Sequence, residues 1–283
     1  MVRILVDSTC DLSPELVKKY NLTICPLHVV LGEQDYKDGV DITVDEIYKW
    51  ADANNATPKT AAVSPEEVMN ALNLLLEEAD EVICFAISSS MSGTYSVMCL
   101  AADTLEVTDR VFCIDSMNLS TGIGLMIIEA AIMAAEGKSA LEIVEHIEFL
   151  KPFIRSSFVV DSLTYLHRGG RCSSVAAMAG GMLKLHPRIA VADGKMSAGK
   201  KYRGKMDKVV LEYVKDMEAE LFKAQTDRVF ITHSGCDEEV LTEVYQYLES
   251  LNVFKEILIT RAGSVISSHC GPGTLGVLYI ARD

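Results

Sequence analysis

The chain has 283 residues, of which 49% are hydrophobic and 23% are charged, so it can bury one large core or two medium cores. We therefore expect two compact domains and no disordered tail. Its formal net charge of -14 at pH 7 argues against binding to nucleic acid, because that affinity is built from clustered Lys and Arg side chains.

Apolar runs of strand length alternate with segments of helical periodicity from one end of the chain to the other. The runs are continuous and do not alternate with polar residues, which is typical of parallel strands covered by helices on both faces. We therefore predict an α/β protein. The predicted strands are residues 2–6, 82–87, 111–114, 158–160, 229–232 and 257–260.

Helix starts in the first half of the chain are marked by capping residues. A Ser or Thr followed three positions later by Glu forms a capping box, and a Pro suits the first position of a helix. Such starts are Ser13-Pro14, Thr43 with Glu46, and Ser64-Pro65 with Glu67. Residues 119–135 and 141–150 form a further predicted pair of helices, interrupted at Glu136-Gly137.

A domain boundary is expected just after this pair of helices. Lys151-Pro152 ends the helical run, and a new strand is predicted to begin at Ile154. We therefore place an N-terminal parallel-sheet domain at residues 1–152 and a second α/β domain at residues 153–283.

Two segments of the second domain stand out by composition. Residues 173–183 are mostly small and are predicted to form a helix, which either packs against a neighbouring element or lies along an apolar ligand. A basic cluster then follows on an otherwise acidic protein, and it is either a docking surface or a solvated helix start. The basic cluster consists of Lys200, Lys201, Arg203, Lys205 and Lys208.

Hydroxyl-bearing residues follow three of the predicted strands. Ligands of open α/β sheets collect beyond the carboxyl ends of the strands, so these positions are candidates for a binding site facing the second domain. The segments are Asp7-Ser8-Thr9, residues 88–94 and Asp115-Ser116. Ser92 precedes Gly93 at a helix start, where free N-H groups favour an anion, whereas simple N-capping would explain only one of these serines.

A histidine near the C-terminus is the second candidate. Residues 267–276 read as a rigid Gly/Pro loop, in which His269 lies next to hydroxyl groups and can donate to a carboxylate. The alternative is an α/β hydrolase or acyltransferase that uses Ser92 and His269, although residues 90–93 lack the first Gly of the G-x-S-x-G turn. The sequence contains neither a phosphate-binding loop nor a complete dinucleotide motif.

The cysteines and the uncharged stretches indicate the compartment. The eight cysteines are scattered without a C-x-x-C pair, so we expect reduced core residues. His233 with Cys236, and His269 with Cys270, lack a second pair at zinc-like spacing, so we expect no metal. The opening residues do not resemble an export signal, and the uncharged stretch 262–281 contains Pro and Gly. We therefore expect a cytoplasmic protein without a transmembrane helix or a cofactor.

Several short motifs resemble those of the DegV family. The most specific are Ser92-Gly93-Thr94-Tyr95 and the Leu-x-Arg-Gly-Gly-Arg segment at residues 166–171. The others are Asp7-Ser8-Thr9-x-Asp11-Leu12, Thr60 ahead of Ser64-Pro65, Asp115-Ser116, Asp161-Ser162-Leu163-x-Tyr165 and His269-Cys270-Gly271-Pro272-Gly273. The resemblance spans essentially the whole chain, and the family includes fatty-acid-binding subunits of the bacterial fatty acid kinase.

The resemblance implies two α/β domains with a long-chain fatty acid in an acyl tunnel at or near their interface. The carboxylate would be bound by Thr60, Ser92 and His269, and Arg203 would contact the catalytic subunit of a fatty acid kinase. The protein would then be a carrier that presents the carboxylate for phosphorylation, not an enzyme, and any contact with a membrane surface would be transient. The family usually continues Ser-Gln-Pro after the threonine, whereas this chain has Ala61-Ala62-Val63, which removes one hydroxyl.

Overall fold

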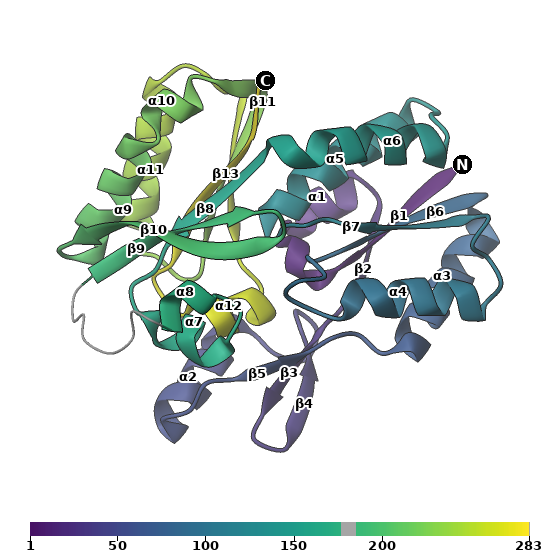
Figure 1. Cartoon of the computed structure of the whole chain (residues 1–283), viewed down its shortest axis with the longest axis horizontal. Helices are drawn as coiled ribbons and strands as arrows, with labels where there is room; N and C mark the ends of the chain where they lie inside the picture. The colour runs from purple at the N-terminus through teal and green to yellow at the C-terminus, as the bar shows by residue number, and fades with distance from the viewer. Residues whose placement is uncertain (177–184, 283) are drawn as a thin grey trace.

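The computed structural model describes residues 1–176 and 185–282, which form three sheets (Figure 1). The first sheet has the order β2-β1-β6-β7, and its neighbouring strands are all parallel. Its strands are β1 (Val2–Asp7), β2 (Leu22–Cys25), β6 (Glu81–Ala86) and β7 (Val111–Asp115). The parallel sheet predicted for the N-terminal half is thereby confirmed.

Helices cover both faces of the first sheet, which explains its continuous apolar runs. One face packs against α3 (Pro65–Glu78) and α4 (Thr94–Thr104), and the other against α5 (Thr121–Ala135) and α6 (Ala140–Leu150). The predicted pair of helices that ends near residue 150 is therefore confirmed as α5 and α6.

The predicted helix starts are also confirmed. Ser64 and Glu67 form a capping box, in which each side chain accepts a hydrogen bond from the other residue's backbone N-H. Two more helices begin where the sequence indicates, namely α1 (Pro14–Lys19) after Ser13 and α2 (Val44–Asn54) after Thr43 with Glu46.

The second sheet has six strands in the order β10-β9-β8-β13-β11-β12. Within it, β11 and β12 are parallel, and the other neighbouring pairs are antiparallel. The prediction of parallel strands is wrong for most of this sheet, because a continuous apolar run reports burial on both faces and not strand direction. The strands are β8 (Ile154–Val159), β9 (Leu185–Ala192), β10 (Lys195–Arg203), β11 (Ala224–His233), β12 (Glu256–Arg261) and β13 (Leu275–Ala281).

Helix α5 lies between the two large sheets. It packs on β1 and β6 of the first sheet and on β8 and β13 of the second, and ten of its 15 residues are buried. The opposite face of the second sheet packs against α9 (Met206–Asp216) and α11 (Glu238–Ser250). The short helix α10 (Glu218–Leu221) follows α9 in the chain. The proposed boundary at 152/153 falls within the 3-10 helix η2 (Lys151–Phe153), just before β8.

A small third sheet with the order β4-β3-β5 was not predicted. Its antiparallel strands are β3 (His28–Leu31), β4 (Gln34–Lys37) and β5 (Lys59–Ala61). Strands of three or four residues are too short to show a clear period in the sequence. The sheet shares a core with Ile47 of α2 and Val265 of α12 (Ser264–Cys270), and Figure 1 shows it beside these helices.

Residues 264–270 form helix α12, so the prediction that His269 lies in a loop is wrong. No helix start is marked in this part of the sequence, because α12 has no capping side chain of its own. Its first N-H groups, those of Gly263 and Ser264, instead donate to Asp11 and Asp38, which precede them by 252 and 226 residues. The cap is therefore a tertiary contact.

Two short helices, α7 (Leu163–Gly169) and α8 (Ser173–Ala176), lie between β8 and β9. The predicted helix at residues 173–183 coincides with α8 over its first four positions, and the rest of that prediction lies outside the described residues. Among the helices described, none is both long enough and apolar enough to cross a membrane.

Candidate functional site

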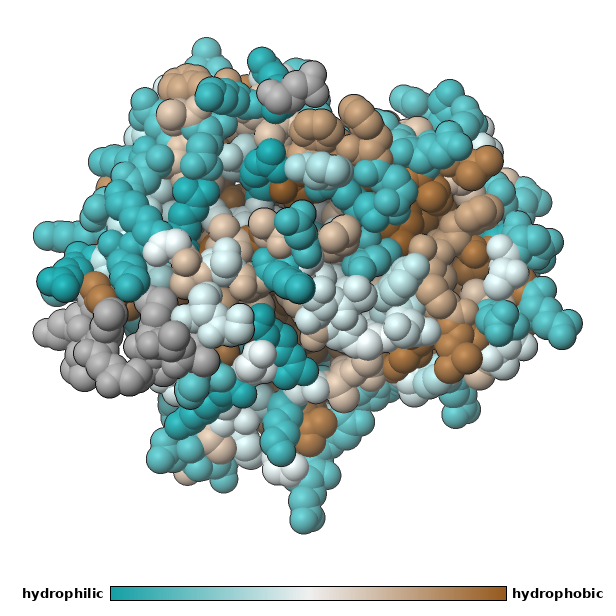
Figure 2. All heavy atoms as spheres, viewed as in Figure 1, coloured by the Kyte–Doolittle hydropathy of each residue, from teal (hydrophilic) through white to brown (hydrophobic). Residues whose placement is uncertain are grey.

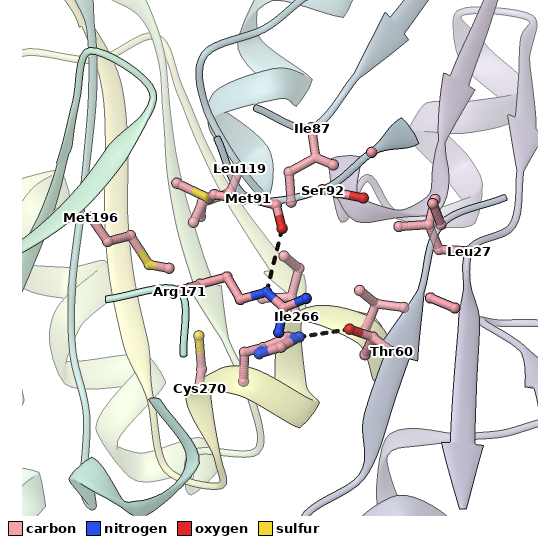
Figure 3. Close-up of a pocket in the computed structure, with 15 residues that line it drawn as sticks. Leu27, Thr60, Ile87, Met91, Ser92, Leu119, Arg171, Met196, Ile266 and Cys270 are labelled. Carbon is pink, nitrogen blue, oxygen red and sulfur yellow. Dashed lines mark hydrogen bonds between the residues drawn. The ribbon is translucent and has the colours of Figure 1, made fainter. Parts of the chain in front are cut away.

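A cavity of about 120 Å³ is lined by residues from all three sheets or the elements that follow them (Figure 3). Met91 and Ser92 come from the loop between β6 and α4, and Thr60 comes from β5. Met196 comes from β10, and His269 from α12. All three residues predicted to bind a carboxylate thus line one cavity, although they are widely separated in the sequence.

The side chains of Thr60 and His269 are hydrogen-bonded, with 2.8 Å between Thr60 Oγ1 and His269 Nε2 (Figure 3). The other ring nitrogen, Nδ1, is buried and has no partner among the residues that the structure describes. Gly169 at the end of α7 makes room for this ring, because a Cβ at position 169 would overlap Nδ1. The glycine therefore permits the contact between α7 and α12.

Burial and, to a smaller extent, the positive charge of Arg171 together lower the pKa of His269 to about 4. The imidazole is therefore neutral near pH 7, well above that pKa. A neutral ring carries one N-H, so His269 acts as a hydrogen-bonding group and not as a cation.

Ser92 lies in the same cavity but bonds to its own helix start. Its Oγ is 2.9 Å from Oγ1 of Thr94 and accepts a hydrogen bond from the Thr94 N-H at 3.3 Å. Within the described structure, His269 bonds to Thr60 and not to Ser92. The Ser-His pair that a serine hydrolase needs is therefore not formed.

Arg171 lines the cavity and had no role in the sequence interpretation. Its guanidinium donates to the carbonyl oxygens of Met91 at 3.4 Å and Gly169 at 2.6 Å, and forms no ion pair with an acidic side chain in the described part of the chain. A cation held by backbone carbonyls beside a cavity favours an anionic ligand. The motif of residues 166–171 was the signal that could have indicated it.

A second, smaller space of about 30 Å³ lies next to this cavity. Leu119, Ile266 and Cys270 line both spaces and separate them. Beyond these residues the wall includes Phe158 of β8 and Leu278 of β13. The two spaces mark a largely apolar route from the polar pair into the interior beside α5.

The other hydroxyl groups after the strands have structural partners. Ser8 donates to Asp38, Thr9 donates to Asp7, and Ser116 donates to the carbonyl of Asn118. Ser88 donates at 2.7 Å to the carbonyl of Gly194, in the turn between β9 and β10. None of these four hydroxyl-bearing residues is among those lining the cavity of Figure 3.

Buried carboxyl groups hold the start of α12, and with it the position of His269. Asp38 accepts from the Ser264 N-H at 2.7 Å, and Asp11 accepts from the Gly263 N-H at 2.8 Å. Burial raises the pKa of Asp38, and it raises that of Asp11 to about 8. Asp11 and Asp38 therefore hold the helix that carries His269 without lining the cavity themselves.

Arg203 lies at the end of β10, exposed and apart from the cavity. The basic cluster therefore runs from the end of β10 onto α9 and is not confined to a helix start. One member, Lys200, pairs with Asp216, and the others are exposed. The hydropathy surface shows hydrophilic side chains gathered over this part of the second sheet (Figure 2).

The His233–Cys236 pair, for which no metal is expected, is held by local hydrogen bonds. Nδ1 of His233 accepts from the N-H groups of Gly235 and Cys236. In residues 1–176 and 185–282, no group of three or more His, Cys, Asp or Glu side chains could hold a metal ion.

Comparisons with known proteins agree with the fold. The chain is 34% identical over 280 residues to a DegV domain-containing protein of Caldanaerobacter subterraneus, covering 98% of each chain. It is 33% identical over 281 residues to one of Clostridium perfringens, covering 99% of this chain and 98% of the relative.

Solved structures are similar over the full length. A DegV family protein from Thermus thermophilus, described by its fatty acid binding, has a TM-score of 0.91 at 32% identity, covering 99% of both chains. A stearic-acid-binding protein from Eubacterium ventriosum has a TM-score of 0.86 at 31% identity, covering 100% of this chain and 99% of that one. The family model described as "Uncharacterised protein, DegV family" matches residues 1–282, and the chain therefore belongs to the DegV family.

Proposed function

We propose that the protein binds a long-chain fatty acid, with the carboxylate at Thr60, Ser92, His269 and Arg171. The observation that carries this proposal is the Thr60–His269 hydrogen bond, which lies beside a cation with no acidic partner in the described structure, at the head of an apolar route. The similar proteins from Thermus thermophilus and Eubacterium ventriosum are described as binding a fatty acid and stearic acid.

The hydrogen-bond directions suit a carboxylate, which only accepts hydrogen bonds. We propose that the neutral His269 donates its Nε2-H to Thr60 Oγ1, which leaves the hydroxyl hydrogen of Thr60 free to donate to the ligand. Ser92 has a hydroxyl hydrogen of its own, and Arg171 supplies the positive charge. Thr60, Ser92 and Arg171 would then donate to the carboxylate from three separate segments, and His269 would orient Thr60.

The acyl chain supplies most of the binding free energy in this proposal. Burying roughly sixteen carbons at about 0.8 kcal/mol each gives on the order of 12 kcal/mol before the costs of association. Hydrogen bonds to a charged acceptor contribute about 1.5 to 3 kcal/mol each and mainly offset the desolvation of the carboxylate. The polar group therefore fixes which end of the ligand faces outward.

The test is organic extraction of the purified protein followed by mass spectrometry, with His269→Ala, Ser92→Ala and the wild type compared. We expect a fatty acid in the wild type and a roughly tenfold to hundredfold weaker retention in each variant, since the acyl chain still binds. Ester hydrolysis is measured on the same samples. Lipid occupancy that is unchanged in both variants would refute the carboxylate site. Ester turnover that is present in the wild type and lost in both variants, with bound lipid retained in Ser92→Ala, would favour the hydrolase.

We also propose that the protein, in the cytoplasm, presents the carboxylate to a partner kinase that forms an acyl phosphate. Its contact with that kinase would use Arg203 and the exposed basic residues around it. Positive charge on a protein of net charge -14 is suited to steering an acidic partner. The protein would carry and orient the substrate, and the kinase would supply the nucleotide chemistry.

Arg203→Glu tests the docking proposal, with Lys223→Glu as a matched change of an exposed basic residue elsewhere. We expect Arg203→Glu to lower the rate of coupled phosphorylation about tenfold or more while lipid content stays the same. Equal effects of the two variants, or loss of lipid in Arg203→Glu, would show that Arg203 is not a docking residue.

A further inference from the structure

Three cysteine side chains meet beside β7, an edge strand of the first sheet. Cys84 of β6 and Cys113 of β7 are register partners on neighbouring parallel strands. Cys99 belongs to α4, which packs on both of these strands. This helix covers the face of the sheet on which Cys84 and Cys113 pack (Figure 1). The thiols of Cys84 and Cys99 lie close enough to that of Cys113 to affect its ionisation. The sequence places these cysteines 14 and 15 residues apart, so only the fold brings them together.

The three thiols differ in access and in acidity. Cys84 is completely buried, whereas Cys99 and Cys113 are partly exposed. Hydrogen bonds from Cys84 and Cys99 lower the pKa of Cys113, even though burial acts in the opposite direction. Burial instead raises the pKa of Cys236 to about 12. Cys113 is therefore the thiol of this group best suited to react as a thiolate.

We propose that Cys113 and Cys99 form an oxidation site for hydroperoxides. The thiolate of Cys113 attacks the O-O bond, takes one oxygen as a sulfenic acid and releases hydroxide or an alkoxide, which leaves as water or an alcohol. The sulfur of Cys99 then attacks the sulfenic sulfur, forms the S-S bond and expels a second hydroxide as water. Two thiols lose two electrons and two protons, and one peroxide is reduced.

Cys99 is the resolving partner because it can move. It lies on the outer helix α4, at a partly exposed position, so forming a bond to Cys113 would not require a strand of the sheet to move. Cys84 lies on a central strand that is hydrogen-bonded to β1 and β7, so closing an S-S bond there would have to displace the ladder. Cys84 contributes a hydrogen bond to Cys113 and remains reduced.

The test uses the full chain, treated with hydrogen peroxide, blocked with iodoacetamide and mapped by peptide mass spectrometry. We expect a linked peptide pair that contains Cys99 and Cys113, with a loss of two free thiols that dithiothreitol reverses. The two thiols should react about tenfold faster than Cys236, which is also partly exposed and has its thiol near the Thr274 carbonyl. This measurement needs no substitution and does not depend on folding of a variant.

Two variants assign the roles. In Cys99→Ser, the sulfenic acid on Cys113 should persist and be trapped by dimedone, whereas Cys113→Ser should give neither product. Cys236→Ser is the control and should behave as the wild type. Oxidation of Cys236 as fast as that of Cys113, or a link between Cys84 and Cys113, would overturn the proposal.

Discussion

His269 shows how burial selects the chemistry of one residue. Its pKa is lowered to about 4, so the ring stays neutral over the physiological range and contributes through its hydrogen bond to Thr60. A protonated ring would pair directly with a carboxylate, but its charge would be costly in this buried place beside Arg171. The neutral pair leaves Arg171 as the cation of the site.

Gly169→Ala should displace His269 without altering any polar group. The new Cβ would overlap Nδ1 of the ring, so the hydrogen bond to Thr60 should be lost and lipid retention should fall about tenfold. Gly199→Ala is the control, because its Cβ would meet only Arg188 O at an ordinary 3.7 Å. Lipid retention is measured for both by extraction and mass spectrometry. Equal retention in the two variants would show that the ring position is not important.

Asp11 should make the stability of the protein depend on pH. Burial and, to a smaller extent, the nearby carboxyl groups of Asp38 and Asp7 together raise its pKa from 3.8 to about 8. The folded state therefore holds this proton more tightly than the unfolded state. The stability that the group contributes is complete below about pH 4 and is lost as the pH rises through about 8, by at most about 1.4 kcal/mol per pH unit.

Asp11→Asn replaces the carboxyl group with an amide, whose oxygen can still accept the hydrogen bond from the Gly263 N-H but which does not titrate. We expect the melting temperature of the wild type to fall relative to that of Asp11→Asn between about pH 5 and about pH 8. Melting curves of both proteins across this range make the comparison. Parallel curves would mean that Asp11 does not carry a raised pKa.

At the scale of elements, α12 is held in place by partners that are remote in the sequence. Asp11 follows the 3-10 helix η1 (Ser8–Cys10), and Asp38 follows β4, so the start of α12 is tied to both the first and the third sheet. The same third sheet carries Thr60, which bonds to the other end of α12. The geometry of the site therefore depends on three segments keeping their places.

Asp38→Ala should loosen α12 at its start. It leaves the buried N-H of Ser264 and the hydroxyl of Ser8 without their acceptor, which costs about 1 to 3 kcal/mol for each group. We expect lower thermal stability together with weaker lipid retention. Asp38→Asn should restore much of both, and the exposed Asp41→Ala should leave both unchanged. Retention that stays normal in Asp38→Ala would uncouple the cap of α12 from the site.

At the scale of the whole molecule, one core joins the two large sheets through α5. The core includes Ile4 of β1 and Ile280 of β13, and the route proposed for the acyl chain enters it beside Phe158 and Leu278. An apolar ligand at this place would contact residues of the second sheet and residues that follow the strands of the first. Its binding should therefore stabilise the whole fold.

Removing the lipid should lower the melting temperature, and adding a long-chain fatty acid should restore it. At a free ligand concentration of one hundred times Kd, linkage gives about 2.7 kcal/mol of stabilisation. Butyric acid has the same carboxylate but almost no tail, so it should give little shift at the same concentration. Differential scanning calorimetry of the delipidated protein makes the comparison. An equal shift with both acids would indicate that the carboxylate, and not the apolar route, dominates binding.

The sequence by itself determined the features that depend on neighbouring residues. Continuous apolar runs predicted buried strands, and Ser64 with Glu67 predicted the start of α3, because capping and burial patterns act over a few positions. The motif resemblance further indicated Thr60, Ser92 and His269, which line one cavity. Arg171 lies within the motif of residues 166–171, but nothing in its local sequence shows that it faces this cavity.

Only the tertiary structure decided which distant segments meet. Strand direction in the second sheet, the short strands of the third sheet and the helical state of His269 depend on contacts between residues far apart in the chain. Thr60 and His269 are separated by 209 residues. Asp11 and Asp38, which cap α12, each precede its start by more than 220 residues. Such contacts form because the free energy of packing offsets the entropy lost in closing long loops. Neither quantity can be obtained from a few neighbouring residues.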